Sequence, residues 1–295
     1  MSSSYDPQLA IALANFSEIT YTQYHNGPPP GNDGTIDPGP GYTQIASFTA
    51  PEIERSTSVT RLSDVAWNQV ARSADIRSRF AGIGDVYFGF ALTSATHNVI
   101  ALRGTQSDFE WMLDGTIPQV PVPLVWYANG QFQLALVHLG FLTLACLLAD
   151  QIISAAKQFD ASLPCLVTGH SLGGALAVLV APIVRLLTPN TSVQMYGLAG
   201  PRVGNPAFAG AYDALIPASF RIVNLADLAP MVPPTQIFDW TYADVGEEWS
   251  FLNQTGNVAG NHALIGPDNY TAAVSAGIPT NAARTYPVTG LGNAR

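Results

Sequence analysis

The spacing of apolar residues along the chain indicates helices and strands in a definite order. Residues 8–24 carry apolar side chains at helical spacing and predict a first helix. The short apolar runs 86–92 and 98–102 lie on either side of a turn and predict two strands. Residues 65–80 have an amphipathic pattern, which predicts a helix before these strands.

After residue 130 the pattern becomes a regular alternation of long and short apolar stretches. Residues 132–153 suit either one long helix or a strand followed by a helix. The alternation continues with a strand, a buried helix and two further strands, at residues 163–168, 175–187, 193–198 and 220–224. Because parallel strands need helical crossovers between them, this order predicts an α/β fold with a mostly parallel central sheet flanked by helices.

The composition is that of one large, weakly charged domain. The chain has 295 residues, of which 47% are hydrophobic and 11% charged, and no shift in composition divides it. We therefore predict a single domain over residues 1–295, in which residues 1–80 form a helical and loop extension packed on the rest. The net charge is −9 and Lys157 is the single lysine, so there is no basic cluster to bind nucleic acid.

We expect neither a transmembrane segment nor a signal peptide. No run of about 18 apolar residues is present, which argues against a spanning helix. The first six residues carry no basic side chain, and no uninterrupted apolar stretch follows them. We favour secretion by another route, or after removal of a leader, over a cytoplasmic location.

Two further features could carry chemistry but have simpler interpretations. The two cysteines, Cys146 and Cys165, fall in apolar segments and are expected to be buried free thiols, although a disulfide between them stays open. The Gly- and Pro-rich segment 27–41 holds Asn and Asp residues whose oxygen atoms could bind a cation. Such residues are more often turn formers, so we predict neither a metal ion nor a cofactor.

The most specific indication of function is the segment Gly169-His170-Ser171-Leu172-Gly173-Gly174. It has the form G-x-S-x-G, with a predicted strand before it and a predicted buried helix after it. A serine on such a sharp strand-to-helix turn points its hydroxyl group out of the sheet, and the glycines leave room for the turn. Ser171 is therefore the candidate nucleophile; the alternative is a helix N-terminus of small residues without chemistry.

A serine nucleophile needs a general base, and that base needs a third group to orient it. Where a G-x-S-x-G turn carries the nucleophile, the acid and then the histidine follow it along the chain. Of the five histidines only His262 follows Ser171, so His262 is the candidate base. His170 should point away from the serine and pack beside the turn. His138 and His97 are interpreted as a structural histidine and a turn residue.

Six acidic residues lie between the candidate nucleophile and base. Asp227 follows the predicted strand 220–224 almost directly, and functional groups of open α/β sheets gather at the carboxyl ends of strands. We therefore favour Asp227 as the acid, with Asp239 and Asp244 as the main alternatives. Asp213 falls in a predicted helix, and residues 244–248 are expected to form a charged loop.

Two backbone N–H groups are candidates for binding the oxyanion of an acyl-transfer reaction. Leu172, directly after the serine, opens the predicted helix and therefore has a free N–H. The second donor should come from a loop after an earlier strand, and Arg103-Gly104-Thr105 follows the strand 98–102. Thr105 is the candidate there; the alternative is a simple turn at the strand end.

Taken together, these segments resemble the class 3 lipases, the group that includes the secreted fungal triacylglycerol lipases. The matching segments stand in the family's order: Arg103-Gly104-Thr105, Glu110-Trp111, His138-Leu139-Gly140-Phe141, the G-x-S-x-G segment, Gly200-Pro201-Arg202-Val203-Gly204-Asn205, Asn224-Leu225-Ala226-Asp227 and His262. The resemblance covers about residues 85–270 and implies an α/β-hydrolase fold. It also implies a nucleophile–base–acid triad at the three candidate residues and an oxyanion hole at Thr105 and Leu172.

The resemblance further implies a lid. Residues 106–114 correspond to the mobile lid helix of these lipases, and Trp111 stands at the place of the lid tryptophan. A lid covers the apolar cleft in water and exposes it at an oil surface; the alternative is an ordinary amphipathic helix that caps the core. The proline-rich residues 115–131 would enlarge the lid or line the acyl groove. Trp111, Leu228 and Val232 are the candidate substrate-binding residues, from their apolar character and position.

These inferences predict a serine carboxylic-ester hydrolase that works through an acyl-enzyme, with triacylglycerol lipase as the favoured activity. The expected partner is a lipid or ester substrate at an oil–water interface, and the oligomeric state stays open. Phospholipase A1 and feruloyl or other soluble-ester esterases are alternatives with the same chemistry. A non-catalytic, lipase-like binding module is the alternative of another class. The spacing between Asp227 and His262 is short for the secreted fungal members, which predicts trimmed loops, and their disulfide framework is absent.

Overall fold

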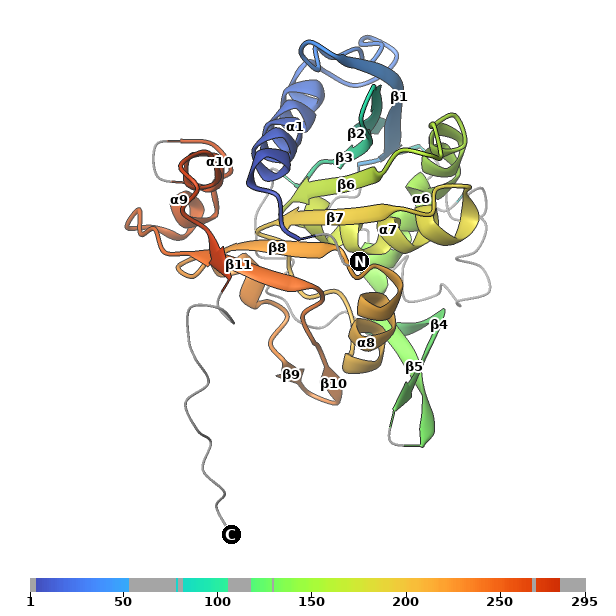
Figure 1. Cartoon of the computed structure of the whole chain (residues 1–295), viewed down its shortest axis with the longest axis vertical. Coiled ribbons are helices and arrows are strands. Elements are labelled where there is room, and N and C mark those ends of the chain that lie inside the picture. The colour runs from blue at the N-terminus through green and yellow to red at the C-terminus, as the bar shows by residue number, and fades with distance from the viewer. Residues whose placement is uncertain are drawn as a thin grey trace.

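An eight-stranded sheet forms the centre of the protein (Figure 1). The computed structural model describes residues 4–52, 78, 82–105, 118–128, 130–266 and 269–281. In both chain and spatial order, the strands are β1 (Tyr42–Pro51), β2 (Asp85–Ser94), β3 (Asn98–Leu102), β6 (Cys165–His170), β7 (Val193–Leu198), β8 (Ser219–Asn224), β11 (Glu247–Phe251) and β12 (Thr280–Asn281). The pairings from β3 to β11 are parallel, whereas those at the two edges are antiparallel. The predicted α/β fold with a mostly parallel sheet is confirmed.

Successive residues of the central strands pack into two different hydrophobic clusters, one on each face of the sheet. In β3, Val99 and Ala101 join the first cluster. Ile100 and Leu102 join the second. The first face is covered by α1 (Pro7–His25) and α10 (Tyr270–Ser275), and the second by α6 (Leu139–Ala156) and α7 (Leu172–Leu187). Burial on both faces explains why these strands are continuous apolar runs in the sequence.

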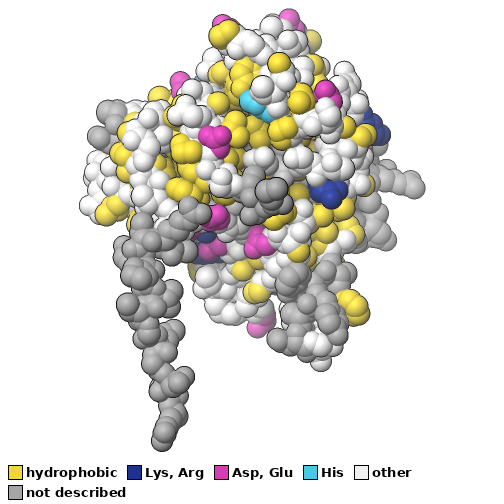
Figure 2. All heavy atoms as spheres, in the orientation of Figure 1, with side chains coloured by type: hydrophobic (Ala, Val, Ile, Leu, Met, Phe, Trp, Pro, Cys, Tyr) yellow, Lys and Arg dark blue, Asp and Glu magenta, His cyan; other side chains and the backbone are white. Residues whose placement is uncertain are grey.

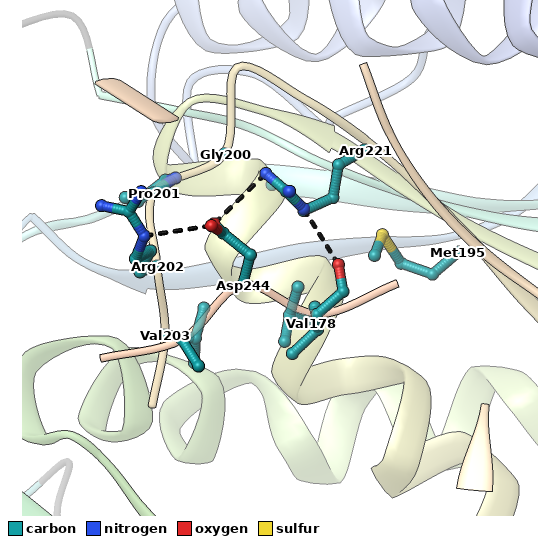
Figure 3. A pocket seen from close by; sticks show the side chains of 12 residues that line it. Val178, Met195, Gly200, Pro201, Arg202, Val203, Arg221 and Asp244 are labelled. Carbon is teal, nitrogen blue, oxygen red and sulfur yellow. Dashed lines mark hydrogen bonds and ion pairs between the residues drawn. The ribbon is translucent and has the colours of Figure 1, made fainter. Parts of the chain in front are cut away.

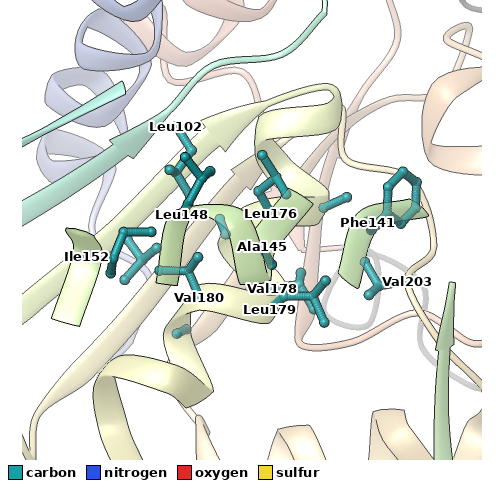
Figure 4. Close-up of a cluster of buried hydrophobic side chains, with 14 of the residues drawn as sticks. Leu102, Phe141, Ala145, Leu148, Ile152, Leu176, Val178, Leu179, Val180 and Val203 are labelled. Atoms are coloured by element: carbon teal, nitrogen blue, oxygen red, sulfur yellow. The ribbon is translucent and has the colours of Figure 1, made fainter. Parts of the chain in front are cut away.

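Helices α6 and α7 pack against each other over the second face (Figure 4). Leu148 of α6 and Leu176 of α7 are completely buried, and Leu102 of β3 belongs to the same cluster. By length and composition alone, α6 could cross a membrane, the one such helix in the part of the chain that the structure describes. However, 61% of it is buried inside the fold, as expected of a core helix.

Most of the predicted elements are confirmed, with shifts at their ends. The predicted N-terminal helix is α1, and the strands predicted at residues 86–92 and 98–102 lie within β2 and β3. Residues 132–153 are a strand followed by a helix, because β5 (Gln131–His138) leads directly into α6. Asp213 lies in a helix as expected, α8 (Pro206–Leu215). Strand β6 continues to His170 and α7 starts at Leu172, so a single residue separates them.

The expectation of a charged loop at residues 244–248 is wrong in its second half. Glu247 and Glu248 begin β11, which pairs in parallel with β8. Arg221 on β8 lies 3.1 Å from the Glu248 carboxylate and compensates its charge within the sheet. The pattern did not indicate a strand because charged residues at a half-buried sheet edge look like a loop in the sequence.

Besides the two-residue strands β9 (Gln236–Ile237), β10 (Trp240–Thr241) and β12, two long strands come from segments in which the sequence predicted none. Within residues 1–80, β1 pairs with β2 along the edge of the central sheet, with two irregularities in register that disturb any alternation. Strand β4 (Gln119–Ala128) pairs with β5 in a hairpin that projects from the body of the protein (Figure 1). Prolines inside β4 made it a poor strand candidate, but a two-stranded hairpin tolerates them at its edges. The predicted helix at 65–80 and the lid helix at 106–114, with Trp111, lie outside the described residues.

Segment 27–41 contains turns formed by its Asn and Asp side chains, and neither cysteine is part of a disulfide. The side-chain oxygens of Asn32, Asp33 and Asp37 each accept the N–H two residues further on, as turn formers do. Cys146 and Cys165 are free thiols; Cys165 is buried as expected, whereas Cys146 is only half-buried. Among the described residues no group of three His, Cys, Asp or Glu side chains could hold a metal ion. On the face drawn in Figure 2, charged side chains are scattered among apolar and polar ones.

Candidate active site

Ser171 lies on a sharp turn between β6 and α7. Its φ of +58° and ψ of −125° fall outside the regions that residues with a side chain prefer, so the turn holds the serine in a strained conformation. The turn also brings the start of α7 against β3. A Cβ at Gly173 would collide with the backbone of Leu102 and would lie 2.9 Å from the carbonyl carbon of Arg103. Glycine at this position is therefore required by the close approach of two backbones.

The structure brings Ser171, His262 and Asp227 into one hydrogen-bonded line. Nε2 of His262 is 2.8 Å from the Ser171 hydroxyl, and Nδ1 is 2.8 Å from Oδ2 of Asp227. Asp227 is completely buried, whereas 17% of the His262 side chain is exposed. Because a carboxylate can only accept, Nδ1 carries the ring proton and Nε2 accepts from the serine. The line can therefore take a proton from Ser171 towards His262.

Asp227 follows β8, and three donors satisfy its carboxylate. Besides His262, the hydroxyl of Tyr270 donates to Oδ2 at 2.8 Å and the backbone N–H of Ala229 donates to Oδ1 at 2.9 Å. Burial, and then the charge of Asp227, raise the pKa of Tyr270 well above its ordinary value, so the phenol keeps its proton and donates. The carboxylate is thus held in one orientation towards His262.

Asparagines join the loop that carries Asp227 to the segment that carries His262. His262 is the last residue of α9 (Val258–His262). The side-chain amide of Asn224 donates to the carbonyl groups of Asn253 and Asn261, at 2.9 and 3.0 Å. In return, the amide of Asn261 donates to the carbonyl of Ala226 at 3.0 Å. These bonds fix the distance between the two loops, and therefore between the two side chains.

The two candidate oxyanion donors come from backbones that meet at the serine. In the sheet, Leu102 at the end of β3 stands opposite Gly169 of β6. A Cβ at Gly104 would lie 2.7 Å from the carbonyl oxygen of His170 and 3.1 Å from Cβ of Ser171, so Gly104 lies against the turn. Thr105 is the next residue. Leu172 is the first residue of α7, and its N–H is not needed by the helix.

The buried side chain of Arg103 holds this loop in place. It donates to the carbonyl of Gly104 at 2.7 Å and to the carbonyl of Tyr87 at 2.9 Å. Its guanidinium carbon is 4.0 Å from the centre of the Tyr24 ring and 4.6 Å from that of Phe88. Cation–π contacts on both rings, and two carbonyl acceptors, compensate the loss of water around the charge.

The alternative acids are engaged elsewhere or lie apart. Asp244 forms ion pairs of 3.2 Å with Arg202 and with Arg221, beside a small cavity of about 10 Å³ (Figure 3). Asp213 accepts the N–H of Gly246. Asp239 lies between two short strands, β9 (Gln236–Ile237) and β10 (Trp240–Thr241). The hydrogen bonds that the structure shows for His262 involve Asp227, Ser171 and His170, and none of these three alternative acids.

The candidate substrate-binding residues have different surroundings. Leu228, directly after Asp227, is 40% exposed. Val232 follows the 3-10 helix Ala229–Met231 and is buried in the cluster below α6 and α7. Trp111 lies outside the described residues.

The other histidines have structural surroundings. His138 caps the N-terminus of α6 by accepting the N–H of Phe141, and burial lowers its pKa to about 3. His97 accompanies the turn between β2 and β3 and is bonded to Tyr42. His170 packs beside the serine as expected, but it also makes two hydrogen bonds that the sequence did not reveal. It contacts the hydroxyl of Tyr21 and the backbone carbonyl of His262.

Comparison with known proteins finds similarity to one family. Residues 99–237 match the family model of the class 3 lipases, and this region includes Thr105, Ser171 and Asp227. A lipase of Caenorhabditis elegans is 30% identical over 197 residues, which are 63% of this chain and 52% of the worm protein. The secreted mono- and diacylglycerol lipase A of Penicillium cyclopium is 30% identical over 187 residues, which are 61% of this chain and 57% of that protein. The chain thus matches a little over half the length of these relatives.

Among solved structures, the Rhizomucor miehei lipase in complex with its propeptide has a similar fold. The two structures have a TM-score of 0.57 and 22% sequence identity, and the likeness covers 86% of this chain and 73% of that one. The likeness shows that the central sheet and its helices form an α/β-hydrolase fold. The matched family model, the relatives and the fold agree, and all three indicate similarity to the class 3 lipases.

Proposed function

We propose that the protein is a serine carboxylic-ester hydrolase, with triacylglycerol lipase as its activity. The observation that carries this proposal is the hydrogen-bonded line from Asp227 through His262 to Ser171, with 2.8 Å at each step. Such a line lowers the barrier for deprotonating the serine hydroxyl as it attacks. The match of residues 99–237 to the class 3 lipase model supports an ester of a lipid as the substrate, as does the acylglycerol activity in the name of the Penicillium relative.

In the proposed mechanism, Ser171 Oγ attacks the carbonyl carbon of the ester while Nε2 of His262 takes the hydroxyl proton. The backbone N–H groups of Thr105 and Leu172 donate to the oxyanion that forms, which is commonly the largest stabilising contribution in such sites. Asp227 keeps the His262 proton on Nδ1 and stabilises the imidazolium.

The tetrahedral intermediate then collapses to the acyl-enzyme. The bond between carbonyl carbon and alkoxy oxygen breaks, and His262 gives its proton to the leaving alcohol. A water molecule next attacks the acyl carbonyl while His262 takes one of its protons. The bond to Ser171 breaks, His262 returns the proton to the serine oxygen, and the fatty acid leaves.

Apolar surface near the site supports a lipid rather than a polar ester. Exposed large hydrophobic side chains flank both Asp227 and His262 in the chain: Leu225, Leu228, Met231, Leu252, Val258 and Ile265. Exposed apolar side chains that form a contiguous patch are typical of surfaces that meet lipid or a partner. We propose that Leu228, with Val232 below it and Trp111 of the proposed lid at 106–114, lines the acyl groove.

Replacement of Ser171 tests the proposed chemistry. We expect Ser171→Ala to lower the hydrolysis of p-nitrophenyl esters by at least about a thousandfold, and Asp227→Asn to lower kcat by about ten-thousandfold. A fluorophosphonate should label the wild-type chain at Ser171, as located by peptide mass spectrometry. Unchanged hydrolysis by Ser171→Ala would exclude this residue as the nucleophile. A wild-type chain that neither hydrolyses esters nor takes up the label would instead be a binding module.

A substrate panel separates the lipase from its alternatives. We expect the wild-type chain to hydrolyse triacylglycerol emulsions faster than phosphatidylcholine vesicles or soluble feruloyl esters, with a rate jump once the substrate exceeds its solubility. The reverse ranking would favour phospholipase A1 or a soluble-ester esterase. Because the Penicillium relative is a secreted protein, we propose an extracellular location as well.

A further inference from the structure

A second line of hydrogen bonds reaches His262 at its backbone carbonyl instead of its ring. His170 immediately precedes the candidate nucleophile, and its side chain is buried. Its Nε2 is 2.9 Å from the backbone carbonyl oxygen of His262, and its Nδ1 is 2.9 Å from the hydroxyl of Tyr21. Tyr21 belongs to α1, 149 residues away in the chain. Helix α1 is therefore linked to the backbone of the candidate base through two side chains.

The chemistry of the partners fixes the direction of each bond. A carbonyl oxygen can only accept, so Nε2 of His170 carries the ring proton and donates it to His262. Burial, and then the neighbouring His262, lower the pKa of His170 well below its ordinary value, so the ring stays neutral. Nδ1 is then a bare acceptor, and the hydroxyl of Tyr21 donates to it. Burial raises the pKa of Tyr21, which keeps that proton in place.

The surroundings leave the His170 ring little freedom to turn. Its ring centre is 5.9 Å from that of Tyr21, 4.8 Å from that of His262 and 5.7 Å from that of Tyr270. The Tyr21 hydroxyl also lies against Gly104, beside the candidate oxyanion donor Thr105, because a Cβ at Gly104 would collide with it. The phenol group of Tyr21 therefore contacts both the loop after β3 and His170, and His170 is in turn bonded to the backbone of His262.

The helix that carries His262 needs such support. Helix α9 has five residues, and none of them is buried. A short helix without a buried face has little packing energy to fix its position. The placement of His262 therefore depends on hydrogen bonds: from Asp227 at its ring, from His170 at its backbone carbonyl, and from Asn224 at the carbonyl of the preceding Asn261.

We propose that Tyr21 and His170 are positioning residues for the reaction: Tyr21 fixes the tautomer of His170, and His170 holds the backbone of His262 so that Nε2 reaches Ser171. The proposal rests on the ester-hydrolase function proposed above. Without the phenol hydroxyl, the His170 proton could move to Nδ1. A bare Nε2 would then face the lone pairs of the His262 carbonyl, and the two groups would repel each other.

Tyr21→Phe tests this proposal, because it removes the hydroxyl and keeps the ring. We expect kcat on a soluble p-nitrophenyl ester to fall about tenfold while KM stays within about twofold, since the base is misplaced but the groove is intact. The chain offers a matched control. Tyr42 makes an equal bond of 2.9 Å to Nε2 of His97, at the turn between β2 and β3. Tyr42→Phe should leave kcat unchanged, and thermal unfolding of both variants compares the losses of stability.

A double-mutant cycle identifies the route through His170. His170→Gln keeps a donor near the position of Nε2 but removes the acceptor for Tyr21. We expect it to retain more activity than His170→Ala, and a further Tyr21→Phe in the Gln background to cost less than about twofold. Wild-type kcat in Tyr21→Phe, or losses that multiply independently in the double variant, would overturn the proposal.

The proposed function and the positioning role fail in different ways. Ester hydrolysis and fluorophosphonate labelling by the wild-type chain test the hydrolase by themselves, and their absence would overturn both proposals. An active wild-type chain with an equally active Tyr21→Phe variant would overturn the positioning role alone. In that case the hydrolase proposal would stand.

Discussion

At the scale of single residues, the site is built where backbones approach one another without side chains between them. Gly104 lies against both the turn at Ser171 and the hydroxyl of Tyr21. Arg103 holds the carbonyl of the same glycine. The loop after β3 therefore has one allowed path, and the N–H of Thr105 takes its direction from it.

Gly104→Ala should therefore lower activity without unfolding the protein. The new Cβ would meet the carbonyl of His170 at 2.7 Å and Cβ of Ser171 at 3.1 Å, which forces the loop away from the serine. We expect kcat on a soluble ester to fall by about a hundredfold. The control is Gly84→Ala, where a Cβ would meet nothing within 4 Å. Equal activity of both variants would show that the path of this loop does not matter for the reaction.

Chain order alone suggested which residues would meet, but not what holds them. His262 could be chosen because no other histidine follows Ser171, and Asp227 because it follows a strand of the sheet. The structure brings these three side chains together, while their catalytic roles stay predictions. Tyr21 and Tyr270 left no local trace in the sequence, because neither stands in a recognisable motif. Their partners lie 149 and 43 residues away.

At the scale of elements, two helices and the strands beneath them form the part of the fold that the sequence predicts best. Helices α6 and α7 and strands β3, β6 and β7 are buried, so their apolar runs are long and unbroken. Strands β1, β4 and β11 escaped prediction because β1 is an edge strand, β4 belongs to a two-stranded hairpin, and β11 lies next to the short edge strand β12. In these places prolines, charges and half-buried residues hide the pattern. Burial is thus what makes an element visible in the sequence.

The packing of α6 on α7 should carry much of the stability. Leu148→Ala removes a completely buried side chain from this contact, and we expect it to lower the free energy of unfolding by about 2–5 kcal/mol. Leu187→Ala is the control at the end of α7, where the side chain is 58% exposed, and should change it by less than about 0.5 kcal/mol. Urea denaturation followed by circular dichroism measures both. A small effect of Leu148→Ala would mean that the cavity collapses.

At the scale of the whole molecule, buried neutral histidines link stability to pH. Burial lowers the pKa of His138 to about 3, and that of His170 well below its ordinary value. In the unfolded chain both would titrate near 6.5. Between these values the unfolded chain binds protons that the folded chain does not. The free energy of unfolding must therefore fall as the pH drops below about 6.5.

His138→Asn tests this link. Asparagine can still cap α6 through its side-chain oxygen, but it has no group that titrates in this range. We expect the free energy of unfolding to depend less steeply on pH between about pH 4 and pH 7 than in the wild-type chain. Urea denaturation across that range gives the slope. An unchanged slope would mean that His138 binds a proton equally in the folded and unfolded states.

The line from Asp227 to Ser171 has a consequence for following the folding of this chain. Its hydrogen bonds join residues 35 and 91 positions apart, and the segments that carry them meet only where parallel strands end side by side. No local fragment can assemble it, so recovery of ester turnover after dilution from urea would report the arrival of the last long-range contact. Helix signals should return earlier, because their contacts are local. The delay between the return of the helix signal and the return of ester turnover would measure how long the sheet takes to bring these segments together.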